Sequence, residues 1–182
     1  ISEVDFENLT FGNVFTDHML VCDYVDGAWQ KPVIEPYAPF MIDPSAKVFH
    51  YGQAIFEGMK AYKDQQDDVW LFRPDENFHR FNKSATRMAM PEVPEDVFLG
   101  GLHRLLEIEK EWVKKGKGNT LYIRPFMIAT GHGVIAAPSQ EYRFMIILSP
   151  ARAYYSGEVK VIIAEHYSRA ANGGIGAAKA AG

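Results

Sequence analysis

The chain has 182 residues, enough for one domain and the start of a second. Its hydrophobic fraction of 47% is that of a globular protein, and its net charge of −4 gives no reason to expect nucleic acid or a membrane surface as a partner. The single cysteine, Cys22, excludes an internal disulfide framework, and no apolar run approaches the roughly 18 residues that span a bilayer. We therefore expect a cytoplasmic protein, or a protein of the mitochondrial matrix if the source is eukaryotic.

The first predicted elements are short strands. Residues 19–25 form a mostly apolar run of strand length, and the following Asp26-Gly27 is a hairpin turn signal. The proline-rich residues 32–44 predict an irregular or edge-like stretch. Residues 68–72 predict a further short strand, which Pro74 ends.

Two helices are predicted next. Residues 75–90 have an acidic first turn and one apolar face, and Pro91 and Pro94 end the pattern. Residues 95–115 continue apolar positions at helical spacing. Lys114 and Lys115 would then lie at the helix C-terminus, where the dipole favours cations.

Three strand-like runs follow, at residues 120–130, 143–149 and 158–165. Pro125 in the first run predicts an edge position or a bulge. Because strands surround the two helices instead of alternating with them, we expect an α+β sheet with helices packed on one face. Ser156-Gly157 is a hinge signal, so we place a small N-terminal domain at residues 1–155 and the start of a second domain at 156–182.

The glycine-rich residues 173–182 contain Lys179 among mostly small neighbours. Small residues let a flat ligand approach the backbone, and an accessible lysine amine can form an imine with a carbonyl cofactor. A phosphate loop of the Walker type would need Gly-Lys-Ser/Thr, and a dinucleotide fingerprint would need glycine in place of Lys179. A flexible surface linker remains an equal alternative on spacing alone.

Other polar and aromatic residues are candidates with simpler alternatives. Tyr51 and Phe56 lie in a non-periodic run that could line a pocket, although both could be core aromatics. Arg80 could bind a phosphate, or lie on a solvated helix face. Tyr122 and Arg124 alternate onto one strand face and could clamp a carboxylate, or mark a strand edge. His50 has no metal-ligand spacing, so we expect no metal site.

Together these segments resemble the branched-chain amino acid aminotransferases, pyridoxal-phosphate enzymes of fold type IV. The match covers nearly the whole chain, and it is the ordered set, not any single piece, that is specific. The matching pieces, in family order, are Phe11-Gly12 with residues 15–19, residues 50–59, residues 71–74 with Asn77 and Arg80, residues 121–125, Ala153-Tyr154 and residues 173–179.

The resemblance implies a role for each candidate residue. Lys179 would form the Schiff base with pyridoxal 5'-phosphate and then move the substrate proton, and Arg80 would bind the cofactor phosphate. Arg124 would bind the distal carboxylate of glutamate. The pocket for a branched aliphatic side chain would be lined by Phe11, Phe56, Tyr122 and Tyr154.

The resemblance also implies a homodimer, because the residues matching Tyr51, Val134 and Ala136 reach into the neighbouring subunit's site in the family. It further implies that residues 156–182 open a larger, C-terminal cofactor-binding domain. The family's remaining cofactor-binding residues would lie beyond Gly182. We therefore expect this stretch alone to have little activity.

The leading function implied is transamination between leucine, isoleucine or valine and 2-oxoglutarate, so that the partners are small amino acids and 2-oxo acids. One alternative is another fold-type-IV enzyme, such as a D-amino acid aminotransferase or aminodeoxychorismate lyase. A second alternative, from a different class, is a non-catalytic phosphate-binding module that forms no imine at Lys179.

Overall fold

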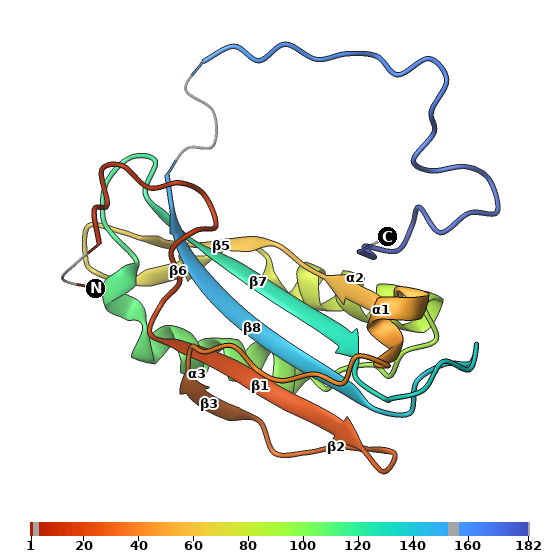
Figure 1. Cartoon of the computed structure of the whole chain (residues 1–182). Coiled ribbons are helices and arrows are strands. Elements are labelled where there is room, and N and C mark those ends of the chain that lie inside the picture. Colours follow the sequence, from red (N-terminus) through yellow and green to blue (C-terminus); the bar gives the residue numbers. More distant parts are fainter. Residues whose placement is uncertain (2–3, 153–156, 182) are drawn as a thin grey trace.

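The computed structural model describes residues 1, 4–152 and 157–181. Within these residues, eight strands form one antiparallel sheet in the order β2-β1-β8-β7-β5-β6, with β3 paired to β1 and β4 paired to β7 (Figure 1). The strands are β1 (His18–Val25), β2 (Ala28–Trp29), β3 (Val33–Pro36), β4 (Ala54–Phe56), β5 (Met59–Lys63), β6 (Val69–Leu71), β7 (Thr120–Ala129) and β8 (Tyr142–Ala151). The expected α+β class is confirmed.

The predicted hairpin after the first strand is present. β1 pairs with β2 through Tyr24–Trp29 and Val25–Ala28. The two residues between the strands, Asp26 and Gly27, both have positive φ, 53° and 77°. Two consecutive left-handed residues are what a type I′ hairpin turn requires, which explains the Asp-Gly signal.

The first predicted helix is confirmed and the second is only partly right. The first is α2 (Pro74–Arg87), with its acidic first turn. In place of one helix over residues 95–115, the chain forms a π-helical turn η1 (Asp96–Gly100), α3 (Gly101–Ile108) and a 3₁₀ turn η2 (Lys110–Trp112). Long-range contacts divert the chain here: buried Glu109 pairs with His18, and the Trp112 indole donates to Asp17.

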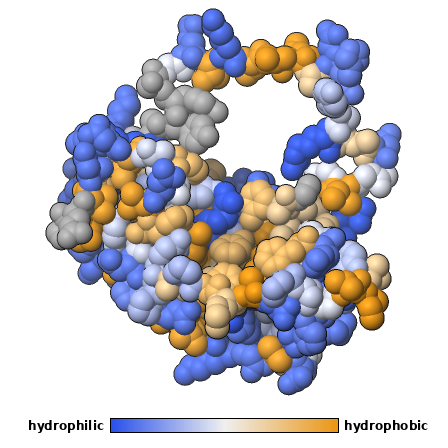
Figure 2. Space-filling view, in the orientation of Figure 1, coloured by the Kyte–Doolittle hydropathy of each residue, from blue (hydrophilic) through white to orange (hydrophobic). Residues whose placement is uncertain are grey.

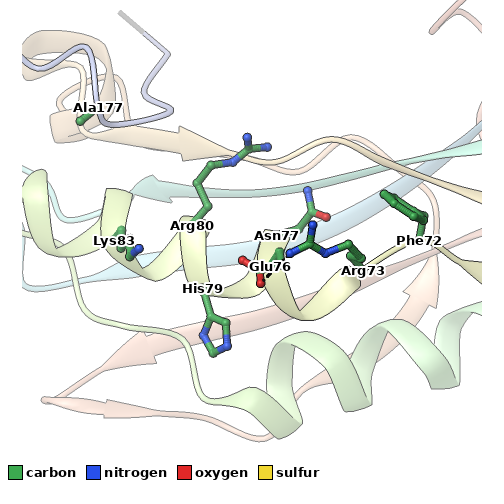
Figure 3. A pocket seen from close by; sticks show the side chains of 8 residues that line it. All are labelled: Phe72, Arg73, Glu76, Asn77, His79, Arg80, Lys83 and Ala177. Atoms are coloured by element: carbon green, nitrogen blue, oxygen red, sulfur yellow. Dashed lines mark hydrogen bonds and ion pairs between the residues drawn. The ribbon is translucent and has the colours of Figure 1, made fainter.

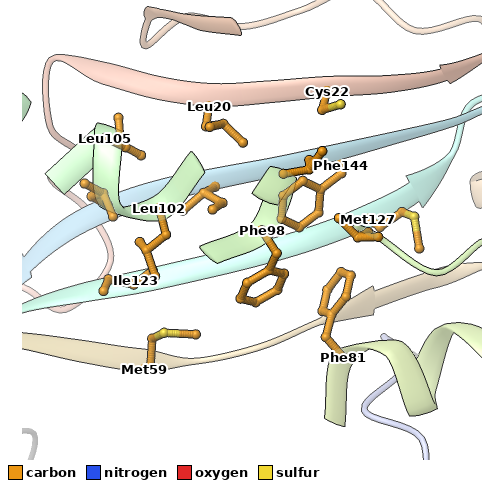
Figure 4. Close-up of a cluster of buried hydrophobic side chains, with 14 of the residues drawn as sticks. Leu20, Cys22, Met59, Phe81, Phe98, Leu102, Leu105, Ile123, Met127 and Phe144 are labelled. Carbon is orange, nitrogen blue, oxygen red and sulfur yellow. The ribbon is translucent and has the colours of Figure 1, made fainter. Parts of the chain in front are cut away.

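The main core lies between one face of the sheet and α2, η1 and α3 (Figures 1 and 4). Alternate residues of each strand point into it, as the pleat requires. Three phenylalanines, Phe81, Phe98 and Phe144, pack ring against ring at its centre, with centroids 5.3–5.5 Å apart. Cys22 is buried in the same cluster, and burial raises the pKa of its thiol to about 11.

The opposite face of the sheet carries a smaller cluster of Met19, Val21 and Met145, with Phe126 and Ile147 packed against it. Figure 2 looks onto this face and shows apolar side chains gathered at its middle. A short helix, α1 (Lys47–Tyr51), lies at the end of β7. Among the described residues, no helix is long and apolar enough to cross a membrane.

Pro125 occupies a central strand whose register is unbroken, so both the predicted edge position and the alternative bulge are wrong. β7 pairs with β8 on one side and with β4 and β5 on the other. The register of β4 continues unchanged into β5, and the pairing is interrupted only at Glu57 and Gly58. Glu57 N–H donates to the Pro125 carbonyl at 2.8 Å, but proline has no N–H to return the bond. One missing donor therefore divides a single strand into two.

The strand expected at residues 158–165 is wrong for this structure. Residues 157–177 form no strand; they arch away from the sheet and return beside it (Figure 1). Val161, Ile162 and Ile163 are exposed and pair with no strand that the structure describes. The expected domain boundary at residues 155 and 156 lies outside the described residues.

Candidate active site

Lys179 lies on the edge of the sheet. Its carbonyl accepts the Phe56 N–H at 3.1 Å, and the Ala181 N–H donates to the Ala54 carbonyl at 3.0 Å. An isolated bridge joins Ile55 and Ala180. The end of the glycine-rich segment is therefore docked on β4 and is not a free surface linker.

Two cations share the ring of Phe56. Lys179 Nζ lies 4.7 Å from the ring centroid, and Arg124 Cζ lies 4.6 Å from it. Arg124 Nη2 donates to Tyr122 Oη at 2.7 Å, and Phe11 meets the Tyr122 ring edge-on with centroids 5.0 Å apart. Residues from four separate parts of the sequence thus meet on the sheet face opposite the main core.

Arg124 also carries a buried donor that lacks a partner. Its Nε makes no hydrogen bond to any residue that the structure describes. A buried polar group left in this state costs about 1–3 kcal/mol. The bond to Tyr122 Oη uses one Nη2 proton, so Nη1 and the second Nη2 proton are the donors with which Arg124 can bind an acceptor on a ligand, whereas the buried Nε is closed off from solvent.

Arg80 lies on α2 and is paired with a buried carboxylate. Its Nε and Nη2 donate to the two oxygens of Glu57 at 2.5 and 2.9 Å, and Asn77 donates to the same carboxylate at 2.8 Å. Burial raises the pKa of Glu57, but the hydrogen bonds from Arg80, Asn77 and the Gly58 N–H outweigh it, so the pKa lies below its ordinary value. The Glu57 hydrogen bonds in turn raise the pKa of Arg80.

A pocket of about 500 Å³ opens beside Arg80 (Figure 3). Figure 3 shows Arg80 and Asn77 on one side of α2, whereas His79 points the opposite way. Ala177, two residues before Lys179, lines the same pocket. A second hollow of about 350 Å³ shares Phe72 and Asn77 with the first and continues to Tyr122. Together the two pockets extend from Arg80 to Tyr122.

The remaining candidates lie elsewhere. Tyr51 Oη donates to the carbonyl of Val134, which joins α1 to the loop between β7 and β8. Val134 and Ala136 are exposed on that loop. No hydrogen bond or ion pair in the described part of the chain connects these residues with Lys179. Tyr154, the last candidate, lies outside the described residues.

Two buried polar residues at the site had been given no role from the sequence. Glu57 and Ser84 are both fully buried, and Ser84 Oγ accepts the Lys179 N–H at 2.9 Å. The lone carboxylate within residues 50–60 was the available signal, because a buried carboxylate needs a cationic partner. Ser84 gave no comparable signal. No cluster of metal-ligating side chains occurs among the residues that the structure describes.

Curated relatives match the chain closely in sequence. Branched-chain-amino-acid transaminase 1 of Bacillus subtilis is 50% identical over 183 residues, covering 98% of this chain and 51% of that protein. The branched-chain-amino-acid aminotransferase of Mycolicibacterium smegmatis is 45% identical over 187 residues, covering 100% of this chain and 51% of that protein. The chain thus spans about half the length of the curated relatives it matches. No family model matches the chain.

Solved structures show the same fold. The T.th. branched-chain amino acid aminotransferase, complexed with N-(5'-phosphopyridoxyl)-L-glutamate, superposes with a TM-score of 0.51 at 22% identity, over 70% of this chain and 39% of that one. An aminotransferase from Brucella abortus bound to PLP gives a TM-score of 0.56 at 17% identity, over 89% of this chain and 53% of that one. By sequence and fold, the chain is homologous to the N-terminal portion of the branched-chain amino acid aminotransferases of fold type IV.

Proposed function

We propose that the intact protein is a transaminase that moves an amino group between leucine, isoleucine or valine and 2-oxoglutarate, using pyridoxal 5'-phosphate. The observation that carries the proposal is the shared Phe56 ring, which the Lys179 amine and the Arg124 guanidinium both contact. An amine for a carbonyl and a guanidinium for a carboxylate are the two groups that this reaction needs. The names of the curated relatives support the branched-chain amino acid as substrate.

The residues fit a phosphorylated aldehyde cofactor. The hydrogen bonds to Glu57 use Nε and Nη2 of Arg80, which leaves Nη1 and the second Nη2 proton for a phosphate. Arg80 and Ala177 line one pocket, so the route from the guanidinium to the lysine segment is open. When bound, pyridoxal phosphate supplies a carbonyl that condenses with amines and a ring that accepts electron density.

Lys179 is the proposed general base and acid. Its Nζ would take the proton from the substrate α-carbon and deliver it to the cofactor. Phe56, Tyr122 and Phe11 form the apolar, aromatic side of the site, suited to an aliphatic side chain. The Nη donors of Arg124 that Tyr122 leaves free would bind the distal carboxylate of the acidic substrate, so that one pocket accepts both kinds of substrate.

Assembly and location are also proposals. We infer a homodimer in which Tyr51 and the loop carrying Val134 and Ala136 contribute to the partner's site, supported by the exposure of that loop. We further propose a two-domain parent with the boundary at residues 155 and 156, and with Tyr154 in the substrate pocket. A cytoplasmic location agrees with one buried, unpaired cysteine.

Borohydride reduction of the intact protein with pyridoxal phosphate, followed by peptide mass spectrometry, tests the proposal. We expect a pyridoxyl adduct on Lys179 and none on Lys47, a buried lysine whose amine donates to two backbone carbonyls. A panel of branched-chain and D-amino acids would then distinguish the proposed activity from those of other fold-type-IV enzymes. A folded protein that stays unlabelled at Lys179 would leave only a non-catalytic phosphate-binding module.

A further inference from the structure

Ser84 connects the two ends of the candidate site. It is fully buried on α2, and both hydrogen-bonding directions of its hydroxyl are used: Oγ accepts the Lys179 N–H at 2.9 Å and donates to the Arg80 carbonyl at 3.0 Å. A hydroxyl fixed by a donor and an acceptor has a single orientation. It therefore acts as a rigid support and not as a freely rotating group.

Ser84 takes the place of a sheet partner. The Lys179 carbonyl accepts the Phe56 N–H, and in a regular antiparallel ladder the Lys179 N–H would return the bond to the Phe56 carbonyl. The Lys179 N–H instead leaves the ladder and donates to Ser84 Oγ on α2. In this conformation, removal of the Ser84 hydroxyl leaves the N–H without an acceptor. The main chain of Lys179 is thus held from two sides, by the strand and by the helix.

Arg80 and Ser84 are four residues apart on one face of α2. This separation is about one helical turn, or roughly 6 Å along the helix axis. Ala85, Ala178 and Ala180 are small and buried near this contact, so the helix and the lysine segment can approach closely. We propose that Ser84 is a positioning residue, which holds Lys179 one helical turn from the arginine proposed to bind the cofactor phosphate. This inference rests on the proposed function.

The experiment compares four forms of the intact protein: wild type, Ser84→Ala, Ser84→Cys and Thr86→Ala. Ser84→Ala removes the acceptor, and Ser84→Cys keeps the approximate shape with only a weak acceptor in case the first variant fails to fold. Thr86 is the control on the same helix, because its hydroxyl also lies within hydrogen-bond distance of the carbonyl four residues earlier, although it contacts Glu92 as well. In the described part of the chain it makes no hydrogen bond with Lys179.

Hydrogen exchange of the Lys179 amide, measured without cofactor, is the first readout. We expect about tenfold faster exchange in Ser84→Ala and a smaller increase in Ser84→Cys, while Thr86→Ala matches wild type. With cofactor, we expect kcat of Ser84→Ala to fall about tenfold while substrate KM changes little, because the amine is displaced and the substrate pocket is intact.

Two results would overturn the inference: wild-type exchange and kcat in both Ser84 variants, or an equal loss in Thr86→Ala. Borohydride labelling of the wild-type protein separates this failure from failure of the proposed function. A labelled Lys179 together with unaffected Ser84 variants rejects the positioning role alone. An unlabelled Lys179 in the wild type rejects the function, and with it the inference.

Discussion

Glu57 is the residue on which the geometry of Arg80 depends. Replacing it with glutamine keeps the shape of the side chain but removes the negative charge that accepts the hydrogen bonds of Arg80 and Asn77. Hydrogen bonds to charged groups contribute about 1.5–3 kcal/mol, and because Arg80 is half exposed we expect Glu57→Gln to lower the free energy of unfolding by only about 1–2 kcal/mol at pH 7. We also expect roughly tenfold weaker binding of pyridoxal phosphate, since the guanidinium is no longer fixed.

The pH dependence identifies the carboxylate as the cause. The folded-state pKa of Glu57 is lowered, so its stabilisation is complete above the unfolded value of about 4.3 and is lost as pH falls through the folded pKa. Urea unfolding between pH 7 and pH 3 should show that the difference in the free energy of unfolding between wild type and Glu57→Gln becomes smaller on acidification. Glu76→Gln, which breaks the exposed Arg73–Glu76 pair, is the control and should change stability little. A difference that stays constant with pH would contradict the assignment.

At the residue scale, sequence reasoning was right where the alternation of side chains along a strand decides which face a residue occupies. Tyr122 and Arg124 were expected on one strand face and do share it, because residues two apart in a strand point the same way. Glu57 and Ser84 could not be assigned in this way. Their roles depend on partners 23 and 95 positions away in the chain, and no local periodicity encodes such pairs.

At the scale of elements, hydrophobic pattern predicted which segments are strands and helices, and tertiary contacts decided where they end. The helix expected over residues 95–115 stops at Ile108 because Glu109 and Trp112 have partners near the start of β1. The central position of Pro125 was missed because a proline excludes only one hydrogen bond. The sheet accommodates that loss by breaking its partner strand at Glu57 and Gly58.

That break also brings Gly58 against the site. A Cβ at this position would lie 2.5 Å from Tyr122 Oη, so the phenol must move in Gly58→Ala and lose its 2.7 Å hydrogen bond with Arg124. Overpacking of this kind costs roughly 1–3 kcal/mol. We expect about a tenfold lower kcat/KM for branched-chain substrates, with the affinity for pyridoxal phosphate near that of wild type.

A double-mutant cycle tests the cause. Tyr122→Phe removes the hydroxyl that the new methyl group would meet, so Gly58→Ala should have a much smaller effect in the Tyr122→Phe background. Equal effects of Gly58→Ala in both backgrounds would place the damage elsewhere, in the backbone at the junction of β4 and β5. Both measurements need only steady-state kinetics and a cofactor titration.

At the scale of the whole molecule, two surfaces are left without a partner among the described residues. One is the run Val161 to Ile163, which reads as a strand in the sequence and is exposed in the structure. The sequence pattern indicates that this segment favours strand pairing, but it does not indicate the partner strand. In the proposed two-domain parent, the second domain would supply that strand. The other surface combines Phe49 and Tyr51 of α1 with Val134 and Ile135 of the neighbouring loop.

The second surface leads to a prediction about assembly. Ile135 is 74% exposed and Val134 is 66% exposed, and Lys47 and Tyr51 fix their loop through its backbone carbonyls. Apolar side chains held in this way on a rigid loop are typical of a protein interface. If they form the proposed homodimer contact, Ile135→Asp buries a charge there, and we expect the dimer dissociation constant to rise at least about tenfold.

Analytical ultracentrifugation of the intact protein over a concentration series measures this shift. Ile108→Asp is the matched control, because Ile108 is also an exposed isoleucine, at 52%, but lies at the end of α3 away from α1. We expect it to leave the dimer unchanged. Because Tyr51 and this loop are proposed to complete the partner's site, monomeric Ile135→Asp should also lose kcat/KM in proportion to its dissociation. An Ile135→Asp protein that stays dimeric would place the interface on another surface and leave Tyr51 as a local support of the loop.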